Sequence, residues 1–288
     1  MTLSRHDVQE MIAANDLRPS RALGQNFVVD PNTVRRVARL AELEDGQRVV
    51  EIGAGIGALT LALVDAGAKV TAVEIDRHLL PILRAQVEDS GVRVVHDDAL
   101  TLDWTALLHG DVATAGTESD RPWALVANLP YNVAVPVIVR ALDEAPDVAS
   151  MLVMVQREVG ERLAAGPGTK AYGAVSVKVA YHADARVVGR VPPAVFVPRP
   201  RVESVLVRIV RRPAVAVDPV VVSPDRLFTV VRAGFAHRRK MLRRSLAGVV
   251  DAGAFTAAAV SPEARAEELS VEDWGRLVAC AQEGDNRW

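Results

Sequence analysis

The sequence predicts an α/β protein with a mostly parallel sheet, followed by a small helical domain. Apolar runs of four to six residues alternate with stretches of helical periodicity, which is typical of a parallel sheet covered by helices on both faces. From about Asp218 the sequence is rich in Ala and Arg with helical periodicity, and Arg212-Pro213 before it is disfavoured inside a helix. We therefore expect domains at residues 1–212 and 213–288.

Seven strands are expected in the larger domain. The first five have helices between them and should be parallel: residues 48–52, 69–74, 92–96, 123–127 and 151–155. Residues 187–191 and 204–210 follow them. The proline-containing segment between these two strands is too short for a helical crossover, so this pair should be antiparallel. Residues 114–120 are predicted to form a flexible loop.

The composition excludes several classes of protein. Cys280 is the only cysteine, so no internal disulfide and no cysteine-based metal site can form, which favours the cytoplasm. Charged residues interrupt the first 19 positions, and we expect no secretory signal. Residues 122–139 carry no charge but contain three prolines and two asparagines, so we expect no membrane segment.

A glycine-rich turn follows the first predicted strand. Residues 49–63, VVEIGAGIGALTLAL, place Gly53, Gly55 and Gly57 between a buried strand and an amphipathic helix. Glycines permit positive φ and a close approach of a ligand to the main chain, and the helix start offers unpaired amides. Dinucleotide-binding enzymes use a similar turn, so this motif alone does not distinguish NAD from other nucleotide cofactors.

Two acidic positions follow the next strands. Glu74 ends the second predicted strand, where its carboxylate could accept hydrogen bonds from the hydroxyls of a ribose, as in NAD or S-adenosylmethionine. Asp98 lies just past the third strand, where it could bind the adenine amine of the cofactor. Asp97 competes for this second role.

The sequence NLPY at residues 128–131 suits methyl transfer to the amine of an adenine. That amine is a poor nucleophile because its lone pair is delocalised into the ring. The side-chain oxygen of Asn128 and a carbonyl of Leu129 or Pro130 could accept both amine protons and localise the lone pair. Tyr131 could stack on the base. This chemistry needs no metal and no covalent nucleophile, and an NAD-dependent oxidoreductase would have no evident use for the motif.

Together these motifs resemble the ribosomal RNA adenine dimethyltransferases, and the resemblance spans nearly the whole chain. Further matching segments are LGQNFVVD at 23–30, GPGTKAYG at 166–173, FVPRPRVES at 196–204 and AHRRKMLRRSL at 236–246. The resemblance implies a Rossmann-like class I methyltransferase fold with a mostly parallel seven-stranded sheet. It also implies S-adenosylmethionine as the methyl donor, and two adjacent adenines near the 3′ end of 16S rRNA, in the immature small subunit, as the substrate.

The resemblance also assigns site residues. It implies that Asn26 and Val28 line the cofactor pocket with Gly53, Gly55, Glu74, Asp98 and Asn128, and that Phe196 joins Tyr131 in holding the flipped adenine. From the residues alone, Asn26 could equally be a loop hydrogen-bonder and Phe196 a core aromatic. Ala54 stands where many relatives carry proline, and Val28 where leucine is common.

The C-terminal part carries a concentrated positive charge. Residues 199–244 contain twelve Lys or Arg and three acidic residues, although the formal net charge of the chain is −2. The candidates for rRNA phosphate contacts are Arg238, Arg239, Lys240, Arg243 and Arg244. The last four follow an i, i+1, i+4, i+5 pattern, which predicts one basic face of a shared helix. A merely solvated helix is the alternative.

Two other functions stay open at this point. A relative that methylates an adenine of 23S rRNA shares the fold and chemistry, although NLPY and HRRKMLRRSL point away from it. A ribosome-assembly factor that acts mainly by binding is the other alternative. We expect a monomer.

Overall fold

The chain folds into two compact units. The computed structural model describes residues 3–15, 17, 19–20, 23–110 and 122–281, so the predicted loop at 114–120 lies outside the described residues. The first unit comprises Met1–Gly160 and Arg186–Val210, and the second comprises Glu161–Ala185 and Arg211–Trp288. The change at residues 210–211 lies close to the expected boundary at 212.

The division differs from the expected one in a single segment, residues 161–185. Tyr172, Val177 and Tyr181 of this segment are buried in the core of the second unit, together with Phe228 and Trp274. Local sequence does not show that residues 161–185 belong to the second unit, because this depends on contacts with helices more than 40 residues later in the chain.

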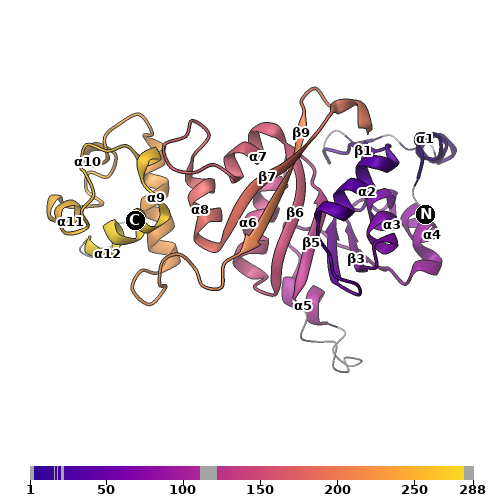
Figure 1. Cartoon of the computed structure of the whole chain (residues 1–288), viewed down its shortest axis with the longest axis horizontal. Helices are drawn as coiled ribbons and strands as arrows, with labels where there is room; N and C mark the ends of the chain where they lie inside the picture. The colour runs from indigo at the N-terminus through magenta and orange to yellow at the C-terminus, as the bar shows by residue number, and fades with distance from the viewer. Residues whose placement is uncertain (1–2, 16, 18, 21–22, 111–121, 282–288) are drawn as a thin grey trace. The chain divides into compact units, whose positions relative to one another are not determined.

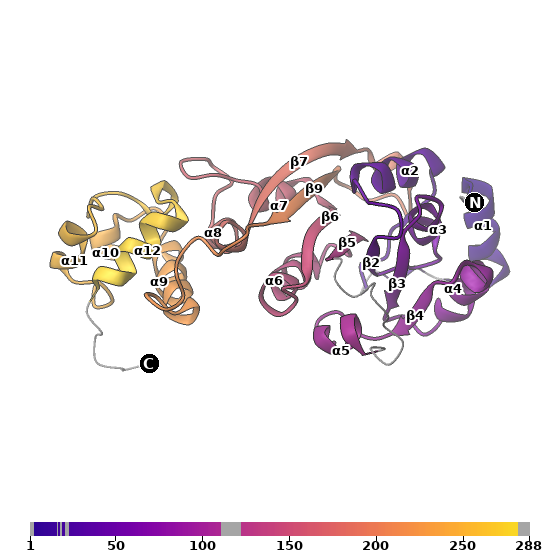
Figure 2. The same ribbon diagram turned by 60° about the horizontal axis from the view of Figure 1, so that its bottom comes forward.

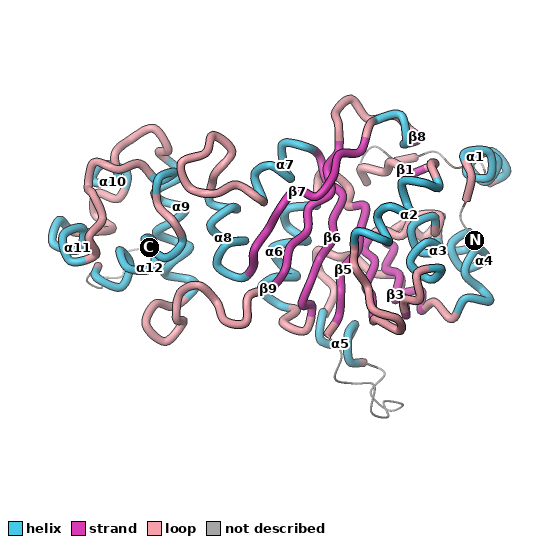
Figure 3. Tube along the Cα trace, in the orientation of Figure 1, coloured by secondary structure: helices cyan, strands magenta, loops and turns pink. Residues whose placement is uncertain are grey.

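A seven-stranded sheet forms the first unit, with the order β4-β3-β2-β5-β6-β9-β7 (Figures 1 and 3). The strands are β2 (Arg48–Ile52), β3 (Lys69–Glu74), β4 (Arg93–His96), β5 (Trp123–Asn128), β6 (Val148–Gln156), β7 (Ala183–Val191) and β9 (Ser204–Arg211). Strands β4, β3, β2, β5 and β6 pair in parallel, as predicted. Strand β9 is antiparallel to β6, and β7 lies beside it at the edge of the sheet.

Helices cover the sheet of the first unit. They are α1 (Arg5–Ala14), α2 (Pro31–Leu40), α3 (Ala58–Asp65), α4 (Leu80–Val87), α5 (Trp104–His109) and α6 (Ala134–Glu144). Figure 2 shows α2 and α3 on one face of the sheet and α5 and α6 on the other. Alternate residues of the strands, including Val49, Val70 and Val126, join α2, α3 and α4 in one buried core, as the two-residue period of a strand requires.

The start of α2 follows from its sequence. Asp30 caps the helix by accepting a hydrogen bond from the amide of Thr33 at 2.8 Å, and Pro31 occupies the first turn. Val34 and Val37 then lie on the buried face of the helix. The cap therefore determines where the segment 23–30 ends and α2 begins, shortly after a short strand.

That short strand, β1 (Phe27–Val28), was not predicted. It pairs antiparallel with β8 (Phe196–Val197), with Val28 opposite Phe196. Two residues are too few for a periodic pattern to be visible in the sequence. The pairing nevertheless brings the LGQNFVVD and FVPRPRVES segments together.

The second unit is helical. Its helices are α8 (Ala174–His182), α9 (Pro224–Ala236), α10 (Leu242–Ser245), α11 (Ala252–Ala257) and α12 (Val271–Cys280), while α7 (Arg157–Leu163) begins in the first unit. Trp274 is fully buried at its centre. Among the described residues the longest helix, α9, has 13 residues, and none has the length and apolar character needed to cross a membrane.

The basic segment does not form one helix, so the predicted shared face is wrong. Helix α9 ends at Ala236, residues 237–240 turn, and α10 begins only at Leu242. The amide of Leu242 donates to the carbonyl of Ala264 rather than continuing α9, and Met241 forms a bridge with Arg265. Long-range main-chain pairing therefore overrides the helical spacing of the arginines.

Candidate active site

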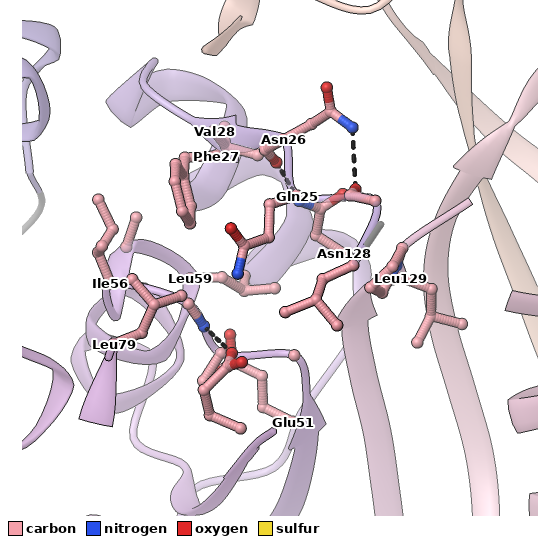
Figure 4. Close-up of a pocket in the computed structure, with 18 of the residues that line it drawn as sticks. Gln25, Asn26, Phe27, Val28, Glu51, Ile56, Leu59, Leu79, Asn128 and Leu129 are labelled. Atoms are coloured by element: carbon pink, nitrogen blue, oxygen red, sulfur yellow. Dashed lines mark hydrogen bonds between the residues drawn. The ribbon is translucent and has the colours of Figure 1, made fainter. Parts of the chain in front are cut away.

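A pocket opens at the carboxyl ends of β2, β3 and β5, where ligands bind in open α/β sheets. It encloses about 730 Å³ of empty space, counted to its open mouth. Nine of the predicted site residues line it: Asn26, Val28, Gly53, Gly55, Glu74, Asn128, Leu129, Pro130 and Tyr131. Figure 4 shows Asn26 and Asn128 on one side of this pocket and Glu51 on another.

The glycine turn and Glu74 hold one another in place. The amide of Gly55 donates to Glu74 Oε2 at 2.7 Å, and the amide of Asp76 donates to Glu74 Oε1 at 2.8 Å. Gly55 has φ +60°, and an added Cβ would lie 3.2 Å from the Phe27 ring. Burial raises the pKa of Glu74, while these amide bonds favour its charged form. A carboxylate has about four acceptor positions, so Glu74 can still bind the two hydroxyls of a ribose.

Glu51 is a second carboxyl group in this pocket, and it was not among the predicted site residues. Its side chain is 1% exposed, and Oε2 has no hydrogen-bond partner among the described residues. Burial raises the pKa of Glu51 to about 8, and the nearby charge of Glu74 adds to the effect. A charged residue inside the apolar strand RVVEI was the available signal.

Asn128 ends β5 with a defined orientation. Its Nδ2 donates a hydrogen bond to the main-chain carbonyl of Asn26 at 2.9 Å. A carbonyl can only accept, so the nitrogen side of the amide must face Asn26 and Oδ1 faces away from it. Asn26 is itself held by a bond from its Nδ2 to the carbonyl of Gly24 at 3.0 Å. The amide of Asn128 therefore offers a positioned acceptor at the pocket.

The rest of the NLPY turn is tied to β6 and β9. The amide of Leu129 donates to the carbonyl of Met154 at 3.1 Å, and the carbonyl of Pro130 accepts from the amide of Val133 at 3.1 Å. The Tyr131 hydroxyl lies 2.9 Å from Ser204 Oγ. Burial raises the pKa of the Tyr131 phenol, and the bond to Ser204 acts against this rise.

Asp98 lines an adjoining pocket rather than the first one. The two pockets share Leu23, Gly53, Ile75 and Pro130 in their linings. Asp97 lines this second pocket as well. Asp98 Oδ1 accepts from the amide of Leu100 at 2.9 Å, and Asp97 Oδ1 accepts from the amide of Asp98 at 2.7 Å. Both carboxylates thus hold their own loop, and the binding role of Asp98 stays a prediction.

Phe196 is not brought to the pocket. Its side chain is 1% exposed and belongs to the apolar core of the first unit, and it is absent from the linings of both pockets. Pairing of β8 with β1 turns this residue inward. A contact between the Phe196 ring and a substrate base would require the ring to leave that core.

Several lining residues were missed by sequence reasoning. Apart from Glu51, they are mainly apolar or main-chain contributors: Leu23, Gly24, Gln25, Phe27, Ala54, Ile56, Ala58, Leu59, Ile75 and Leu79. Gln25 has a specific role, because its Nε2 donates to Asp76 Oδ2 at 2.8 Å and ties the segment before β1 to the end of β3. The segment LGQNFVVD signalled this region, but not which of its side chains would point inward.

The pocket fits S-adenosylmethionine. This cofactor is positively charged at its sulfonium and its ammonium group, and two carboxyl groups, Glu51 and Glu74, stand in the wall. Oε2 of Glu51 is a buried polar atom without a partner among the described residues, and it can bind a donor or a positive charge of the cofactor. No group of His, Cys, Asp and Glu in the part of the chain that the structure describes could hold a metal ion.

The strand order, the glycine turn and the acid at the end of β3 together define a Rossmann-like, S-adenosylmethionine-dependent methyltransferase of class I. Residues 17–283 match the family described as Ribosomal RNA adenine dimethylase, and the chain belongs to this family. It is therefore an enzyme that dimethylates adenine in ribosomal RNA with S-adenosylmethionine as the methyl donor.

Two similar sequences share a name. Ribosomal RNA small subunit methyltransferase A of Streptomyces coelicolor is 47% identical over 280 residues, which are 94% of each chain. The protein of that name from Leifsonia xyli subsp. xyli is 46% identical over 284 residues, covering 95% of each chain.

Two solved structures share the fold. The 23S rRNA methyltransferase ErmE has a TM-score of 0.66 and 26% identity, over 89% of this chain and all of that one. A dimethyladenosine transferase from Plasmodium falciparum has a TM-score of 0.67 and 22% identity, over 86% of this chain and 94% of its own.

Proposed function

We propose that this enzyme dimethylates two adjacent adenines near the 3′ end of 16S rRNA, in small subunits that are still maturing. The relatives at 46–47% identity are named for the small subunit, whereas the similarity to the 23S enzyme is 26%. The observation that carries the chemistry is the hydrogen bond from Asn128 to Asn26, which turns Oδ1 of Asn128 into a fixed acceptor.

In this proposal the chain itself activates the adenine amine. Oδ1 of Asn128 accepts a hydrogen bond from one amine N–H, and a main-chain carbonyl of the NLPY turn accepts a hydrogen bond from the other, so that the lone pair points toward the methyl group. The bound cofactor supplies an electrophilic methyl group on a sulfonium. After the transfer the nitrogen carries the methyl group, both protons and a positive charge, and it loses one of these protons to solvent. Catalysis depends on alignment and electrostatics.

We assign the second acceptor to the carbonyl of Leu129. The carbonyl of Pro130 already accepts a hydrogen bond from Val133 at 3.1 Å, whereas no described residue donates to the carbonyl of Leu129. Leu129 also follows Asn128 directly, so the two acceptors are adjacent at the carboxyl end of β5. In the same scheme Tyr131 stacks on the flipped adenine, and Phe196 supports the wall of the pocket from the core.

The pocket supports the cofactor roles that we propose. Asn26, Val28, Gly53 and Gly55 form its wall, Glu74 binds the ribose, and Asp98 binds the adenine amine of the cofactor from the adjoining pocket. Glu74 would hold the ribose of the cofactor and Asp98 its adenine amine. The methyl donor would then have one orientation beside Asn128.

For RNA contacts we propose three residues of the second unit, Arg239, Lys240 and Arg244. All three are exposed, and none has an ion pair with any described residue. By contrast, Arg238 pairs with Glu267 and Arg243 lies 3.6 Å from Glu263. Unpaired cations gain most from phosphate, because they need not first leave a protein carboxylate.

We further propose that the enzyme acts as a monomer in the cytoplasm, where small subunits mature. A mass near 30.9 kDa by light scattering is expected for the free protein. A mass near twice this value would contradict the monomer.

The test is methyl transfer from labelled S-adenosylmethionine to unmodified small-subunit particles, with 23S rRNA in parallel, followed by nucleoside analysis. Dimethyladenosine in 16S rRNA alone supports the proposal. Label in 23S rRNA would show that the substrate is 23S rRNA, as for ErmE, and would contradict the proposal. Binding to the particles without any label would instead favour the assembly-factor function.

A further inference from the structure

A buried hydroxyl reaches the active-site tyrosine from a different strand. Ser204 is the first residue of β9, and its side chain is 0% exposed. Its Oγ lies 2.9 Å from the hydroxyl of Tyr131, and either oxygen can act as the donor. Valine and leucine follow Ser204 in the strand and are fully buried. A polar group at the start of such a strand is costly unless it is paired.

The register of the sheet explains why Ser204 lies beside the active site. Asn128 of β5 is opposite Met154 of β6, and Gln156 of β6 is opposite Ser204 of β9. Because β9 is antiparallel, its first residue lies at the edge where the parallel strands end. That edge carries the pocket and the NLPY turn, and the hydroxyls of Tyr131 and Ser204 meet there although β6 lies between β5 and β9 in the sheet.

The hydrogen bond constrains the direction of the Tyr131 side chain. The near end of this side chain is set by the turn after Pro130, whose carbonyl is bonded to Val133. The far end is set by Ser204. The hydroxyl lies on the axis about which the ring rotates, so the bond fixes where this axis points. It thereby fixes where the ring lies beside the pocket, and stacking depends on that position.

We propose that Ser204 is a positioning residue, which orients the Tyr131 ring for the adenine through its hydroxyl. This inference rests on the proposed stacking role of Tyr131. It also gives a function to the last residue of the FVPRPRVES segment. Ser204 itself does not line the pocket, so it acts only through the tyrosine.

A double-mutant cycle tests the inference. Single-turnover methyl transfer to small-subunit particles is measured for the wild type, Ser204→Ala, Tyr131→Phe and the double variant. Each single variant is expected to lower the rate about 3- to 10-fold, as for the loss of one hydrogen bond. The double variant should be no slower than either single variant, because all three lack the same bond. Losses that multiply would overturn the proposal.

Two further variants separate positioning from stability. Ser176→Ala removes another buried serine hydroxyl, which donates to the carbonyl of Arg162 at 2.6 Å in the second unit. It should lower the melting temperature without the kinetic coupling to Tyr131→Phe. Ser204→Thr keeps the hydroxyl and should restore most of the rate. Should Ser204→Ala fold poorly, an unchanged rate in Tyr131→Phe overturns the proposal by itself.

Tyr131→Ala distinguishes this inference from the proposed function. A large loss in Tyr131→Ala, with full activity in Ser204→Ala and Tyr131→Phe, would leave the stacking role intact and refute the positioning role. Full activity in Tyr131→Ala would refute both. The affinity for S-adenosylhomocysteine should not change in any of these variants except Tyr131→Ala, because the Tyr131 ring remains in the pocket wall in all the others.

Discussion

The side-chain nitrogen of Asn128 donates a 2.9 Å hydrogen bond to the carbonyl oxygen of Asn26, which lies 102 residues earlier in the chain. This bond joins the last residue of β5 to the segment that precedes β1. It decides which end of the amide faces Asn26, and it leaves the oxygen to accept a hydrogen bond from a substrate amine.

Asn128→Asp should lose methyl transfer, although it only replaces the side-chain amide with a carboxylate. A carboxylate has no N–H for the carbonyl of Asn26, so the two acceptors repel and the side chain turns away. We expect the single-turnover rate to fall at least about 100-fold, as for loss of a positioned acceptor or donor in other sites. Asn128→Ala should behave similarly.

Both variants should keep their circular dichroism spectrum and their affinity for the small subunit. Asn32→Ala, which removes an exposed asparagine on α2, serves as the control and should be fully active. Wild-type turnover in Asn128→Asp would contradict the assigned role of the amide.

Gly55→Ala should weaken cofactor binding. Gly55 has φ +60°, which costs an L-residue roughly 1 to 2 kcal/mol, and the new Cβ would lie 3.2 Å from the Phe27 ring. Relief of this contact moves the amide that holds Glu74. Loss of that charged hydrogen bond predicts an affinity for S-adenosylhomocysteine about 10- to 100-fold lower, measured by calorimetry.

Gly91→Ala is the matched control for the backbone strain. Gly91 has φ +69°, but an added Cβ there meets nothing within 4 Å. It should lose comparable stability and keep the cofactor affinity. An affinity lowered equally in the two variants would show that strain alone, and not the contact with Phe27, determines the effect. Wild-type affinity in Gly55→Ala would contradict the prediction.

Stability without cofactor should fall as the pH rises from about 4.5 to about 8. Burial raises the pKa of Glu51 from its ordinary value of 4.5 to about 8, so between these values the folded state holds a proton that the unfolded state has lost. The free energy of unfolding therefore decreases with pH in this window and levels off above it. Glu51→Gln should remove most of this decrease, as measured by urea unfolding across the pH range.

The control for that experiment is Glu44→Gln, because Glu44 is exposed. It should keep the wild-type dependence on pH. A Glu51→Gln protein whose stability falls as steeply as that of the wild type would assign the dependence to other groups.

Replacing Arg239, Lys240 or Arg244 by alanine should weaken binding to small-subunit rRNA through lost phosphate contacts. The slope of log affinity against log salt should decrease by about 1 for each residue that contacts a phosphate. Arg276→Ala is the control, since Arg276 is engaged with Asp273 on α12. Unchanged slopes in all three variants would place the RNA on another surface.

The strands and the pocket motifs could be predicted because their signals lie within short stretches of the sequence. Buried parallel strands are continuous apolar runs, and a glycine turn and NLPY carry their chemistry within a few residues of a strand end. The five parallel strands and the position of Glu74 at the end of β3 therefore agree with prediction.

Elsewhere the local pattern was insufficient. The spacing from Arg239 to Arg244 fits one helix, yet Leu242 pairs with Ala264 and the helix is interrupted. The residue type of Phe196 does not show whether its side chain lies in a core or in a base-binding site. Pairing of β8 with β1 places it in the core, and two residues show no periodicity from which that pairing could be predicted.

Local sequence was sufficient to predict the α/β class, the order of the strands along the chain and the residues that end β2, β3 and β5. These depend on burial period and turn chemistry, which each residue shares with its neighbours along the chain. Three features could be seen only in the folded chain: the orientation of the Asn128 amide, the partner of Tyr131 and the unit to which residues 161–185 belong. Each of these depends on a contact between residues at least 40 positions apart, and such a contact leaves no trace in the local pattern of either segment.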